Sequence, residues 1–370
     1  MLRIRDPLHG TVQLSDLEEK LLDSRQMQRL RGIRQLAMAY LVYPGANHTR
    51  FEHSIGTLAL ADRICREMGL GKDEAGEVRA AALLHDVGHT AFSHEGEAVL
   101  SKFIGNHEKV GEGMIMSGEI RDILSEQYSP KKIAKLPHTR MGEIISSDIG
   151  ADRMDYLLRD SHYTGVAYGA IDSEWLCASL LLSGGRLYLA ERGLPAAESL
   201  LVARFTMFST VYLHKTVRIA SRMLQQSMRL ALEDGTLDAQ AASGLSDAKM
   251  LEILQGSKTG GAYAKGLAER RLYKKAYSFP LSGFKGKIGA MESELSDACG
   301  CDVLLDVPRL SSQTQIKMSR EDGSEIPLSR ASELVRSLSR MQKPRLDVLA
   351  ICGERNVKKV ADKAAKLLGK

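Results

Sequence analysis

Six of the ten histidines of this 370-residue chain lie between positions 48 and 107, where an even spread would place fewer than two. They are His48, His53, His85, His89, His94 and His107. Neutral imidazole is the commonest nitrogen ligand of transition metals, and a neighbouring carboxylate supplies an oxygen ligand. His53, His85 and Asp86 are therefore the first candidates for a divalent-metal site.

The His85–Asp86 pair says little by itself. Ten histidines predict about half a His-Asp dipeptide by chance, and coincidence at a helix end is the simpler explanation of a lone pair. The context favours a site. The segment from Glu74 to His85 predicts a helix with an acidic start and an AAALL packing face, and this helix ends just before Gly88. A helix end lets side chains turn toward a cavity while the rest of the helix stays packed.

The rest of the chain predicts a mostly α-helical fold. Residues 1–234 are expected to form a helical domain, and the polar, Gly-rich change in composition after 235 predicts a smaller C-terminal α+β lobe over 235–370. Further helices are predicted at 54–69, 107–116, 142–161, 172–182, 195–214, 215–233, 329–341 and 355–368. Strands are predicted at 186–191, 303–307, 315–318 and 346–351.

The bulk composition excludes several classes of protein. No run of eighteen apolar residues is present, so no membrane association is expected, and the N-terminus lacks the apolar core of a secretory signal. Five scattered cysteines are typical of a reducing compartment, which predicts a cytoplasmic protein in which Cys299 and Cys301 are structural. A net charge of +5 is compatible with polyanionic ligands, although surface solvation explains it equally well.

A hydrolase of phosphoric esters or anhydrides needs a metal that activates water, groups that neutralise phosphoryl charge and a proton donor. Asp152, in the predicted helix DIGADRMDYLLRD, is the best candidate for a fourth ligand. At spacings of three and four, its helix face also presents Asp155 or Tyr156, and Arg159 or Asp160. A solvated, salt-bridged face is the alternative explanation of this helix.

The remaining chemical groups lie near the histidine-rich region. Arg50, His89 and His94 are candidate phosphate donors, and His107 is a candidate general acid. His48 and His138 are interpreted as loop or surface residues.

Several motifs together resemble a known family. DPLHG (6–10), QRLRGIRQL (28–36), YPGANHTRFEHSIG (43–56), LLHDVGHTAFSH (83–94), NHE (106–108) and ADRMDYLLRD (151–160) occur in this order. They resemble the HD-domain phosphohydrolases, in particular the branch that contains the sterile-alpha-motif and HD-domain deoxynucleoside triphosphate triphosphohydrolase. The resemblance covers the helical domain well and continues more weakly into the C-terminal lobe. It implies an HD-domain helical bundle, while the sterile-alpha-motif domain itself is not expected in this chain.

The resemblance also implies roles for individual residues. His53, His85, Asp86 and Asp152 would hold the metal, and His107 would be the general acid, with Glu97 standing where the family has an Asp oriented toward that histidine. The phosphate contacts would be Arg50, His89, His94, Arg153 and Arg204. The deoxyribose and its 3′-hydroxyl would be held by Gln35, Leu36, Tyr156, Asp160 and Tyr212, and Tyr212 would exclude a 2′-hydroxyl.

Some positions depart from the family pattern. Phe208 stands where the family enzyme has a histidine near the triphosphate, and Gly150 replaces an acidic residue. Asp23, Gln28 and Arg31 match a guanine-reading allosteric site at a subunit interface. The rest of that nucleotide-binding segment does not match, at Leu2, Arg3, Arg5 and Thr11.

Three hypotheses follow. The first is a divalent-metal-dependent enzyme, using Mn, Fe, Zn, Ni or Mg, that cleaves deoxynucleoside triphosphates to deoxynucleoside and tripolyphosphate. It would act as a homo-oligomer (dimer or tetramer) with a guanine nucleotide as activator. The second keeps the metal but makes the chain a phosphohydrolase or phosphodiesterase of other nucleotides. The third is a nucleotide-sensing or nucleic-acid-binding assembly protein, suggested by the arginine-rich QMQRLRGIR segment.

Overall fold

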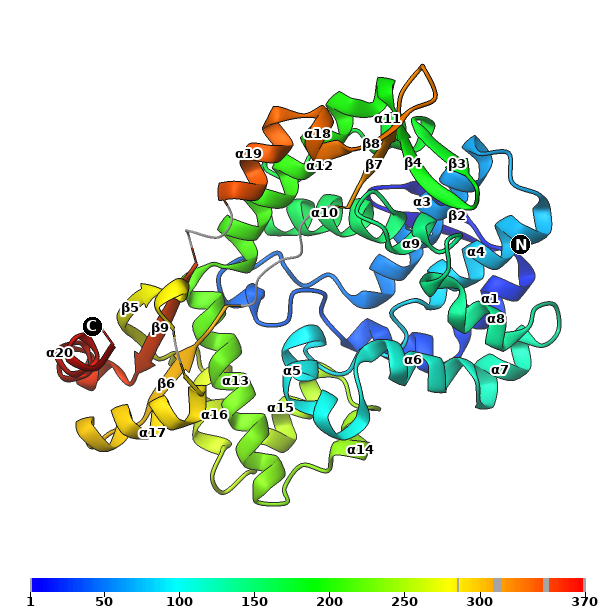
Figure 1. Ribbon diagram of the computed structural model, residues 1–370. Helices are drawn as coiled ribbons and strands as arrows, with labels where there is room; N and C mark the ends of the chain where they lie inside the picture. Colours follow the sequence, from blue (N-terminus) through cyan, green and yellow to red (C-terminus); the bar gives the residue numbers. More distant parts are fainter. Residues whose placement is uncertain (1, 285, 309–314, 342–345, 369–370) are drawn as a thin grey trace. The chain divides into compact units, whose positions relative to one another are not determined.

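The structure is a computed structural model, and it describes the chain except for residues 1, 285, 309–314, 342–345 and 369–370. The described residues are mostly α-helical, as predicted, with a few short strands (Figure 1). They form two compact units. The first comprises Met1–Met207, Ala239–Met250 and Thr314–Arg336, and the second comprises Phe208–Asp238, Leu251–Gln313 and Ser337–Lys370. The predicted domains, 1–234 and 235–370, are two continuous segments, whereas each compact unit combines separate segments of the chain. The division at 234/235 stays a prediction.

The first unit contains most of the helices. Its helices are α1 (Asp16–Asp23), α2 (Arg25–Arg29), α3 (Arg50–Glu67), α4 (Lys72–Leu84), α5 (Ser93–Ile104), α6 (His107–Ile115), α7 (Gly118–Leu124), α8 (Pro130–Lys135), α9 (Glu143–Ser146), α10 (Ala151–Thr164), α11 (Ser173–Ala178), α12 (Leu194–Met207), α14 (Ala239–Ala242) and α18 (Leu328–Ala331). Its strands are β1 (Arg3–Asp6), β2 (Gly10–Gln13), β3 (Leu180–Ser183), β4 (Arg186–Ala190), β7 (Lys317–Ser319) and β8 (Glu325–Pro327). Two helices, α15 (Asp247–Gln255) and α19 (Glu333–Met341), contribute residues to both units.

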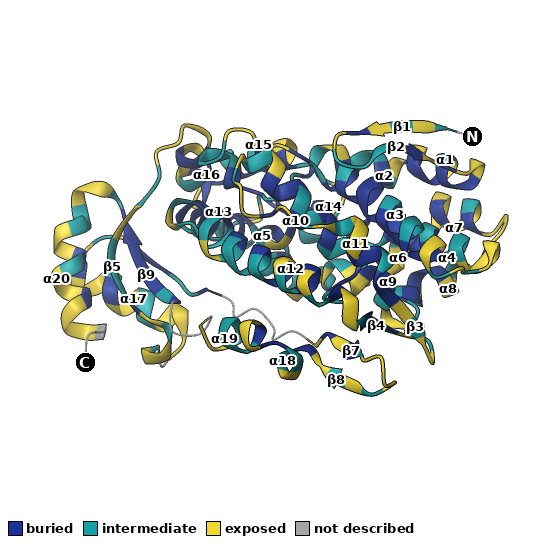
Figure 2. Ribbon diagram, turned by 90° about the horizontal axis from the view of Figure 1, so that it is seen from above, coloured by how far each residue is buried: buried dark blue, intermediate teal, exposed yellow. Residues whose placement is uncertain are grey.

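Helix α3 is central to the first unit. It packs against α4 and α10, and most of its length is buried (Figures 1 and 2). A capping box fixes its start, because the Thr49 amide donates to the Glu52 carboxylate. Helix α4 ends at Leu84 with His85 as its C-terminal cap. The end of α4, the first turns of α3 and the start of α10 can therefore present side chains to one place.

The strands of the first unit lie at its margin. β1 and β2 form an antiparallel hairpin with Arg3 opposite Gln13. A four-stranded sheet has the order β3-β4-β7-β8, in which β4 and β7 are parallel.

The second unit has a small sheet with helices against it. Its elements are α13 (Lys215–Glu233), α16 (Gly261–Ala268), β5 (Lys274–Pro280), α17 (Ile288–Cys299), β6 (Val303–Asp306), β9 (Asp347–Cys352) and α20 (Val357–Leu368). The sheet order is β5-β9-β6, and both pairs are antiparallel. The central strand β9 is buried, whereas α20 exposes its outer face (Figure 2). Cys299 and Cys352 are free thiols in the apolar core beneath this sheet, and Cys301 packs against that core.

Three predicted helices are shorter in the structure than in the sequence pattern. The segment 142–161 is broken between Ser146 and Ala151, where Gly150 makes a turn so close to Ile145 that a Cβ would overlap the backbone. The segment 172–182 ends at Ala178, because Leu180–Ser183 pairs with β4. The segment 195–214 ends at Met207 and continues as a π-helical turn, Phe208–Tyr212. Among the described residues, no helix is both long and apolar enough to cross a membrane.

Candidate functional site

Four side chains converge in the first unit: His53 from α3, Asp152 from α10, and His85 and Asp86 from the end of α4 and the turn after it. The ligand atoms of His53, His85 and Asp152 all lie within 4.8 Å of one another. Asp152 Oδ1 is 3.1 Å from His53 Nε2 and 3.8 Å from His85 Nε2. Asp86 completes the group, with Oδ2 3.6 Å from His53 Nε2 and Oδ1 3.5 Å from His85 Nε2. These four residues are the metal ligands predicted from the sequence, and we call them the HHDD cluster.

Hydrogen bonds set the orientation of both imidazoles. His85 donates from Nδ1 to the Ala82 carbonyl at 2.8 Å, and its Nε2 is buried without a hydrogen-bond partner among the described residues. His53 is fully buried and donates from Nδ1 to Asp155 Oδ2 at 2.7 Å. Because each Nδ1 atom donates to a group outside the HHDD cluster, each Nε2 atom faces the carboxylates of the cluster. This is how metal-binding histidines are usually held. His53 Nε2 donates to Asp152 Oδ1 at 3.1 Å, and a bound cation would take the place of that proton.

A buried network behind His53 explains the DPLHG motif. Asp155 accepts two hydrogen bonds of 2.9 Å from the Arg159 guanidinium and one of 2.6 Å from His9 Nε2. Arg159 also binds Asp6 Oδ2 at 3.0 Å. Asp155 and Arg159 are completely buried. Residues at the N-terminus of the chain therefore help to hold the carboxylate that orients His53.

Two glycines allow this close packing. A Cβ on Gly56, in the HSIG motif, would overlap the side chains of Asp155 and Arg159. A Cβ on Gly88, just after the His-Asp pair, would overlap the backbone of α6 at His107. Gly56 thus lets α3 approach the Asp155–Arg159 pair closely, and Gly88 lets its loop approach the backbone of α6.

The HHDD cluster favours a positive charge. Burial alone would raise the pKa of Asp152, but the hydrogen bond from His53 and the nearby His85 imidazole hold it well below its ordinary value. Burial likewise opposes ionisation of Asp86, but the Arg50 guanidinium and His85 hold its pKa low. Burial would lower the pKa of His53, yet its bonds to Asp152 and Asp155 raise that pKa to about 10. Two ionised carboxylates beside two imidazoles are a donor set that fits a divalent cation.

Replacing Asp155 with Asn is expected to weaken divalent-metal binding by about 10- to 100-fold, which is typical when a group that orients a metal-binding histidine is lost. The neutral amide accepts more weakly from His53 Nδ1, so the imidazole loses its fixed orientation. Titration calorimetry with Mn²⁺ measures the change. Asp6→Asn is the matched control, because Asp6 binds Arg159 but is not a hydrogen-bond partner of His53. An equal loss of affinity in both variants would assign the effect to general loosening of the network.

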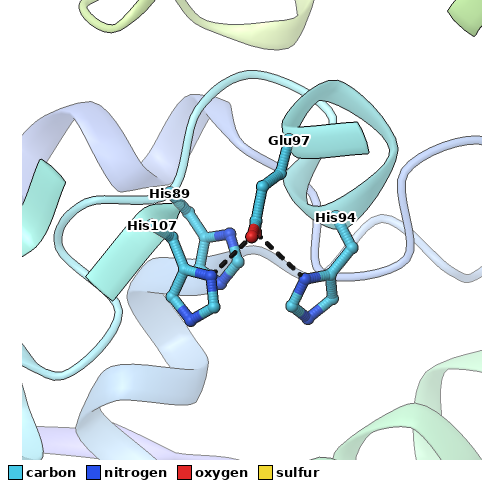
Figure 3. A group of neighbouring side chains, drawn as sticks. All are labelled: His89, His94, Glu97 and His107. Atoms are coloured by element: carbon cyan, nitrogen blue, oxygen red, sulfur yellow. Dashed lines mark hydrogen bonds and ion pairs between the residues drawn. The ribbon is translucent and has the colours of Figure 1, made fainter. Parts of the chain in front are cut away.

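A second group of side chains comprises His89, His94, Glu97 and His107 (Figure 3). Glu97 Oε2 lies 2.7 Å from His107 Nδ1 and 3.3 Å from His94 Nδ1. The ring of His89 stacks on that of His107, with centroids 4.0 Å apart and planes 10° from parallel. His89 is 1% exposed, and its ring nitrogens lack hydrogen-bond partners among the described residues, although Asp86 Oδ1 is 3.3 Å from its Nε2.

The Glu97 carboxylate and the His107 imidazole stabilise each other's charged form. Burial would lower the pKa of His107, but the hydrogen bond to Glu97 outweighs it and raises that pKa. Burial would raise the pKa of Glu97, but His107 and His94 hold it far below its ordinary value. Burial and the nearby Arg50 lower the pKa of His89, which is therefore neutral at pH 7.

The loop that carries these histidines is strained. Phe92 and Ser93 have φ values of 62° and 53°, a left-handed conformation that non-glycine residues rarely adopt. Asp247 accepts from the Phe92 amide at 2.7 Å, and Ser93 Oγ accepts from Arg50 Nε at 2.9 Å. Arg50 also binds Asp86, so it lies between this loop and the HHDD cluster.

The predicted phosphate-binding arginines on α10 and α12 meet at one carboxylate. Arg153 NH1 lies 2.7 Å and Arg204 NH1 3.3 Å from the same oxygen, Asp148 Oδ1. Burial and the nearby Arg153 lower the pKa of Arg204. Two guanidinium groups that share one carboxylate leave an excess of positive charge.

The residues predicted to hold a sugar are partly gathered in the first unit. Gln35 is buried, and its Oε1 has no hydrogen-bond partner among the described residues. Leu36 and Tyr156 are half-buried. Asp160 is buried and binds His48 Nε2 at 2.8 Å. His48 lies in a loop, as predicted, but this imidazole is 1% exposed and is therefore not a surface residue.

The remaining predicted residues are Tyr212, for the sugar, and Asp23, Gln28 and Arg31, for the allosteric nucleotide. Tyr212 belongs to the second unit, where its ring packs edge-on against Phe208. Asp23 is exposed at the end of α1. Gln28 donates to the Leu22 carbonyl and accepts from Arg31 Nε, and the Arg31 guanidinium lies 3.7 Å from the centre of the Phe51 ring. Their role in binding a guanine nucleotide stays a prediction.

Four acidic residues important to this geometry were not predicted as site residues. Asp6 and Asp155 lie inside the motifs DPLHG and ADRMDYLLRD, so the motifs themselves carried the signal. Asp148 opens the segment DIGADRMDYLLRD but precedes the motif ADRMDYLLRD, and Asp247 lies far from every motif. Only the folded chain brings these two residues to the arginines and to the strained loop.

Comparisons with known proteins agree with this architecture. A family model described as "HD domain" matches residues 50–160, and one described as "HD associated region" matches residues 171–369. An uncharacterized protein of Methanocaldococcus jannaschii is 36% identical over 322 residues, which cover 82% of this chain and 68% of that protein. The crystal structure of a hypothetical protein from Aquifex aeolicus superimposes with a TM-score of 0.82 at 29% identity and covers 98% of this chain and 99% of that one.

One relative has a stated activity. The "deoxynucleoside triphosphate triphosphohydrolase SAMHD1 homolog" of Dictyostelium discoideum is 28% identical over 307 residues, which cover 73% of this chain and 59% of that protein. This chain spans only part of the length of these curated relatives. The motifs, the HHDD cluster and the two family matches together show that the chain belongs to the HD-domain phosphohydrolase superfamily.

Proposed function

We propose that this chain is a metal-dependent hydrolase that cleaves deoxynucleoside triphosphates to deoxynucleoside and tripolyphosphate, by attack of water at the α-phosphorus. The observation that carries the proposal is the HHDD cluster with a carboxylate-bound histidine, His107, and two arginines on the same compact unit. The similarity to a deoxynucleoside triphosphate triphosphohydrolase supports the choice of substrate.

The HHDD cluster would hold the divalent ion. The fit rests on the buried His85 Nε2, which has no hydrogen-bond partner among the described residues, and on the His53 Nε2, which Asp155 directs toward the two carboxylates. When bound, such an ion lowers the pKa of a water ligand toward about 7 and polarises a phosphoryl oxygen. Imidazole and carboxylate ligands suit Mn, Fe, Zn or Ni, and Mg if substrate oxygens assist.

The arginines and histidines would bind the triphosphate. Arg153 and Arg204 would exchange part of their contact with Asp148 for phosphate oxygens, to which guanidinium groups donate in pairs. His89 and His94 would donate to other phosphate oxygens, and Arg50 would hold Asp86 and a phosphate together.

His107 would protonate the leaving oxygen. Its bond to Glu97 favours the imidazolium form near neutral pH, and Nδ1 is the atom that Glu97 holds. Nε2 is then the nitrogen that delivers the proton to the leaving oxygen. Glu97 keeps the imidazole in this orientation.

The sugar would lie near Gln35, Leu36, Tyr156 and Asp160, which all belong to the first unit. The buried Gln35 Oε1 offers an acceptor for the 3′-hydroxyl. We extend the proposal to a cytoplasmic homo-oligomer that a guanine nucleotide activates at Asp23, Gln28 and Arg31.

Product analysis tests the proposal. The protein is incubated with Mn²⁺ and each deoxynucleoside triphosphate or its ribonucleotide counterpart, with and without GTP, and products are separated by chromatography and ³¹P NMR. Deoxynucleoside and tripolyphosphate from deoxynucleotides alone are expected, with faster turnover when GTP is present. Equal cleavage of ribonucleotides, or release of pyrophosphate or orthophosphate, would instead indicate a phosphohydrolase of other nucleotides. No turnover with Mn²⁺, or with Fe²⁺, Zn²⁺, Ni²⁺ or Mg²⁺ in its place, would favour a nucleotide- or nucleic-acid-binding protein.

A further inference from the structure

The second histidine group is built like a separate ligand set. His94 and Glu97 are three residues apart on α5 and therefore share one face of that helix. His107 is the first residue of α6, and the Glu97 carboxylate lies between the Nδ1 atoms of the two histidines (Figure 3). The donor atoms of His89, His94, Glu97 and His107 all lie within 4.8 Å of one another.

The length of Glu97 matters for this arrangement. A glutamate has one methylene more than the aspartate expected from the family pattern, and its carboxylate reaches both imidazoles. Two nitrogen donors and one carboxylate from two helices are a ligand set found in zinc enzymes that leave the fourth position open. In its present orientation, His89 cannot serve as a fourth ligand beside His94, Glu97 and His107. Its ring is nearly parallel to that of His107, so the in-plane lone pairs of the two rings do not meet at one point.

We propose that His94 Nδ1, His107 Nδ1 and the Glu97 carboxylate form a second cation site for a borderline transition metal such as Zn²⁺, and that its occupation inhibits hydrolysis. The Glu97 oxygen is 3.3 Å from His94 Nδ1, which is close to the separation of about 3.3 Å between neighbouring ligands of a tetrahedral Zn²⁺. Its 2.7 Å hydrogen bond with His107 Nδ1 would lengthen when the cation replaces the proton. Mg²⁺ prefers oxygen ligands and would not bind two imidazoles. The inhibitory part rests on the proposed function, whereas the binding part does not.

The inhibition follows from the role of Nδ1. A metal ligand must be unprotonated at the ligating atom. A cation bound to His107 Nδ1 therefore replaces the proton that Glu97 accepts in the proton-donating form of the imidazole. It also occupies the Glu97 carboxylate and His94. The remaining Nε2–H then belongs to a metal-bound imidazole and is a much weaker acid than an imidazolium, so proton donation is weakened and one phosphate contact is lost.

Zinc stoichiometry tests the binding. The full chain is dialysed against buffered Zn²⁺ with Mg²⁺ in excess, and bound zinc is counted by mass spectrometry. The wild-type chain is expected to hold two equivalents, and His94→Ala and Asp152→Asn one each. His94 is suited to this test because its side chain is 60% exposed and its removal leaves the bond between Glu97 and His107 in place. His138→Ala, an exposed histidine elsewhere, is the matched control and should retain two.

A second variant separates ligand loss from misfolding. Glu97→Asp keeps a carboxylate but shortens it, and the affinity for the second zinc is expected to fall by at least about tenfold. In a Mn²⁺-supported assay, the zinc concentration that halves turnover should rise by a similar factor in this variant. Two retained equivalents in His94→Ala, or unchanged zinc affinity in Glu97→Asp, would overturn the second site.

The second metal site and the proposed function can be refuted separately. Two zinc equivalents without nucleotide turnover would refute the proposed function and keep the second site. Turnover by a chain that holds one zinc, which Asp152→Asn removes, would keep the proposed function and refute the second site. Two equivalents with turnover that zinc does not inhibit would refute the inhibitory role.

Discussion

Replacing Asp152 with Asn is expected to remove one bound divalent ion and to lower nucleotide hydrolysis by at least about a thousandfold, because the metal would be the group that lowers the pKa of water from about 15.7 to about 7. Asp86 is bound by Arg50, so part of its charge is already neutralised. Among the described ion pairs, Asp152 contacts only the two histidines of the HHDD cluster. Its negative charge is therefore the one most available to a cation, and the isosteric amide removes it.

Metal content after dialysis against Mn²⁺ and initial rates of deoxynucleotide cleavage measure the two effects. Asp122→Asn is the matched control, because Asp122 is an exposed aspartate on α7 that pairs with its neighbour Arg121. It should keep full metal content and turnover. A fully active, metal-replete Asp152→Asn protein would contradict the assignment of the HHDD cluster, and the metal measurement stays informative whatever the substrate proves to be.

Local sequence patterns predicted the helices that carry this cluster. The acidic start and the apolar AAALL face of α4 predicted its position and its end at the His-Asp pair, and the structure confirms both. Helix α13 was predicted with the correct bounds for the same reason, since its apolar residues repeat at helical spacing. Strand β3 was missed, because a leucine-rich segment suits a helix and a strand equally and its pairing with β4 decides between them.

The ligands of the HHDD cluster were predictable because each lies in a compact motif. The partners that hold them were harder to predict. The shared contact of Arg153 and Arg204 with Asp148 joins residues from α10 and α12 through a carboxylate just before the ADRMDYLLRD motif. The sequence pattern places Asp155 on a polar helix face. In the structure this carboxylate is buried and forms an ion pair with Arg159. Sequence spacing shows which residues share a face, but burial depends on what packs against that face.

Replacing Gly56 with Ala is expected to destabilise the protein by at least about 2 kcal/mol, although the same change in most helices is stabilising. The new methyl group would overlap the side chains of Asp155 and Arg159, which have no exposed surface and no room to withdraw. Overpacking a core costs about 1–3 kcal/mol, and breaking a buried ion pair costs about 3–5 kcal/mol. The better helix propensity of alanine returns at most about 1 kcal/mol.

Urea unfolding at equilibrium measures the change, and Gly113→Ala is its matched control. Gly113 lies within α6, is exposed and has nothing within 4 Å of the position that a Cβ would take. This variant should be as stable as the wild type or more stable by up to about 1 kcal/mol. The two glycine variants should therefore shift stability in opposite directions or by clearly different amounts. Equal stability of both would mean that the Asp155–Arg159 pair can move aside, and His53 would then not be rigidly oriented from behind.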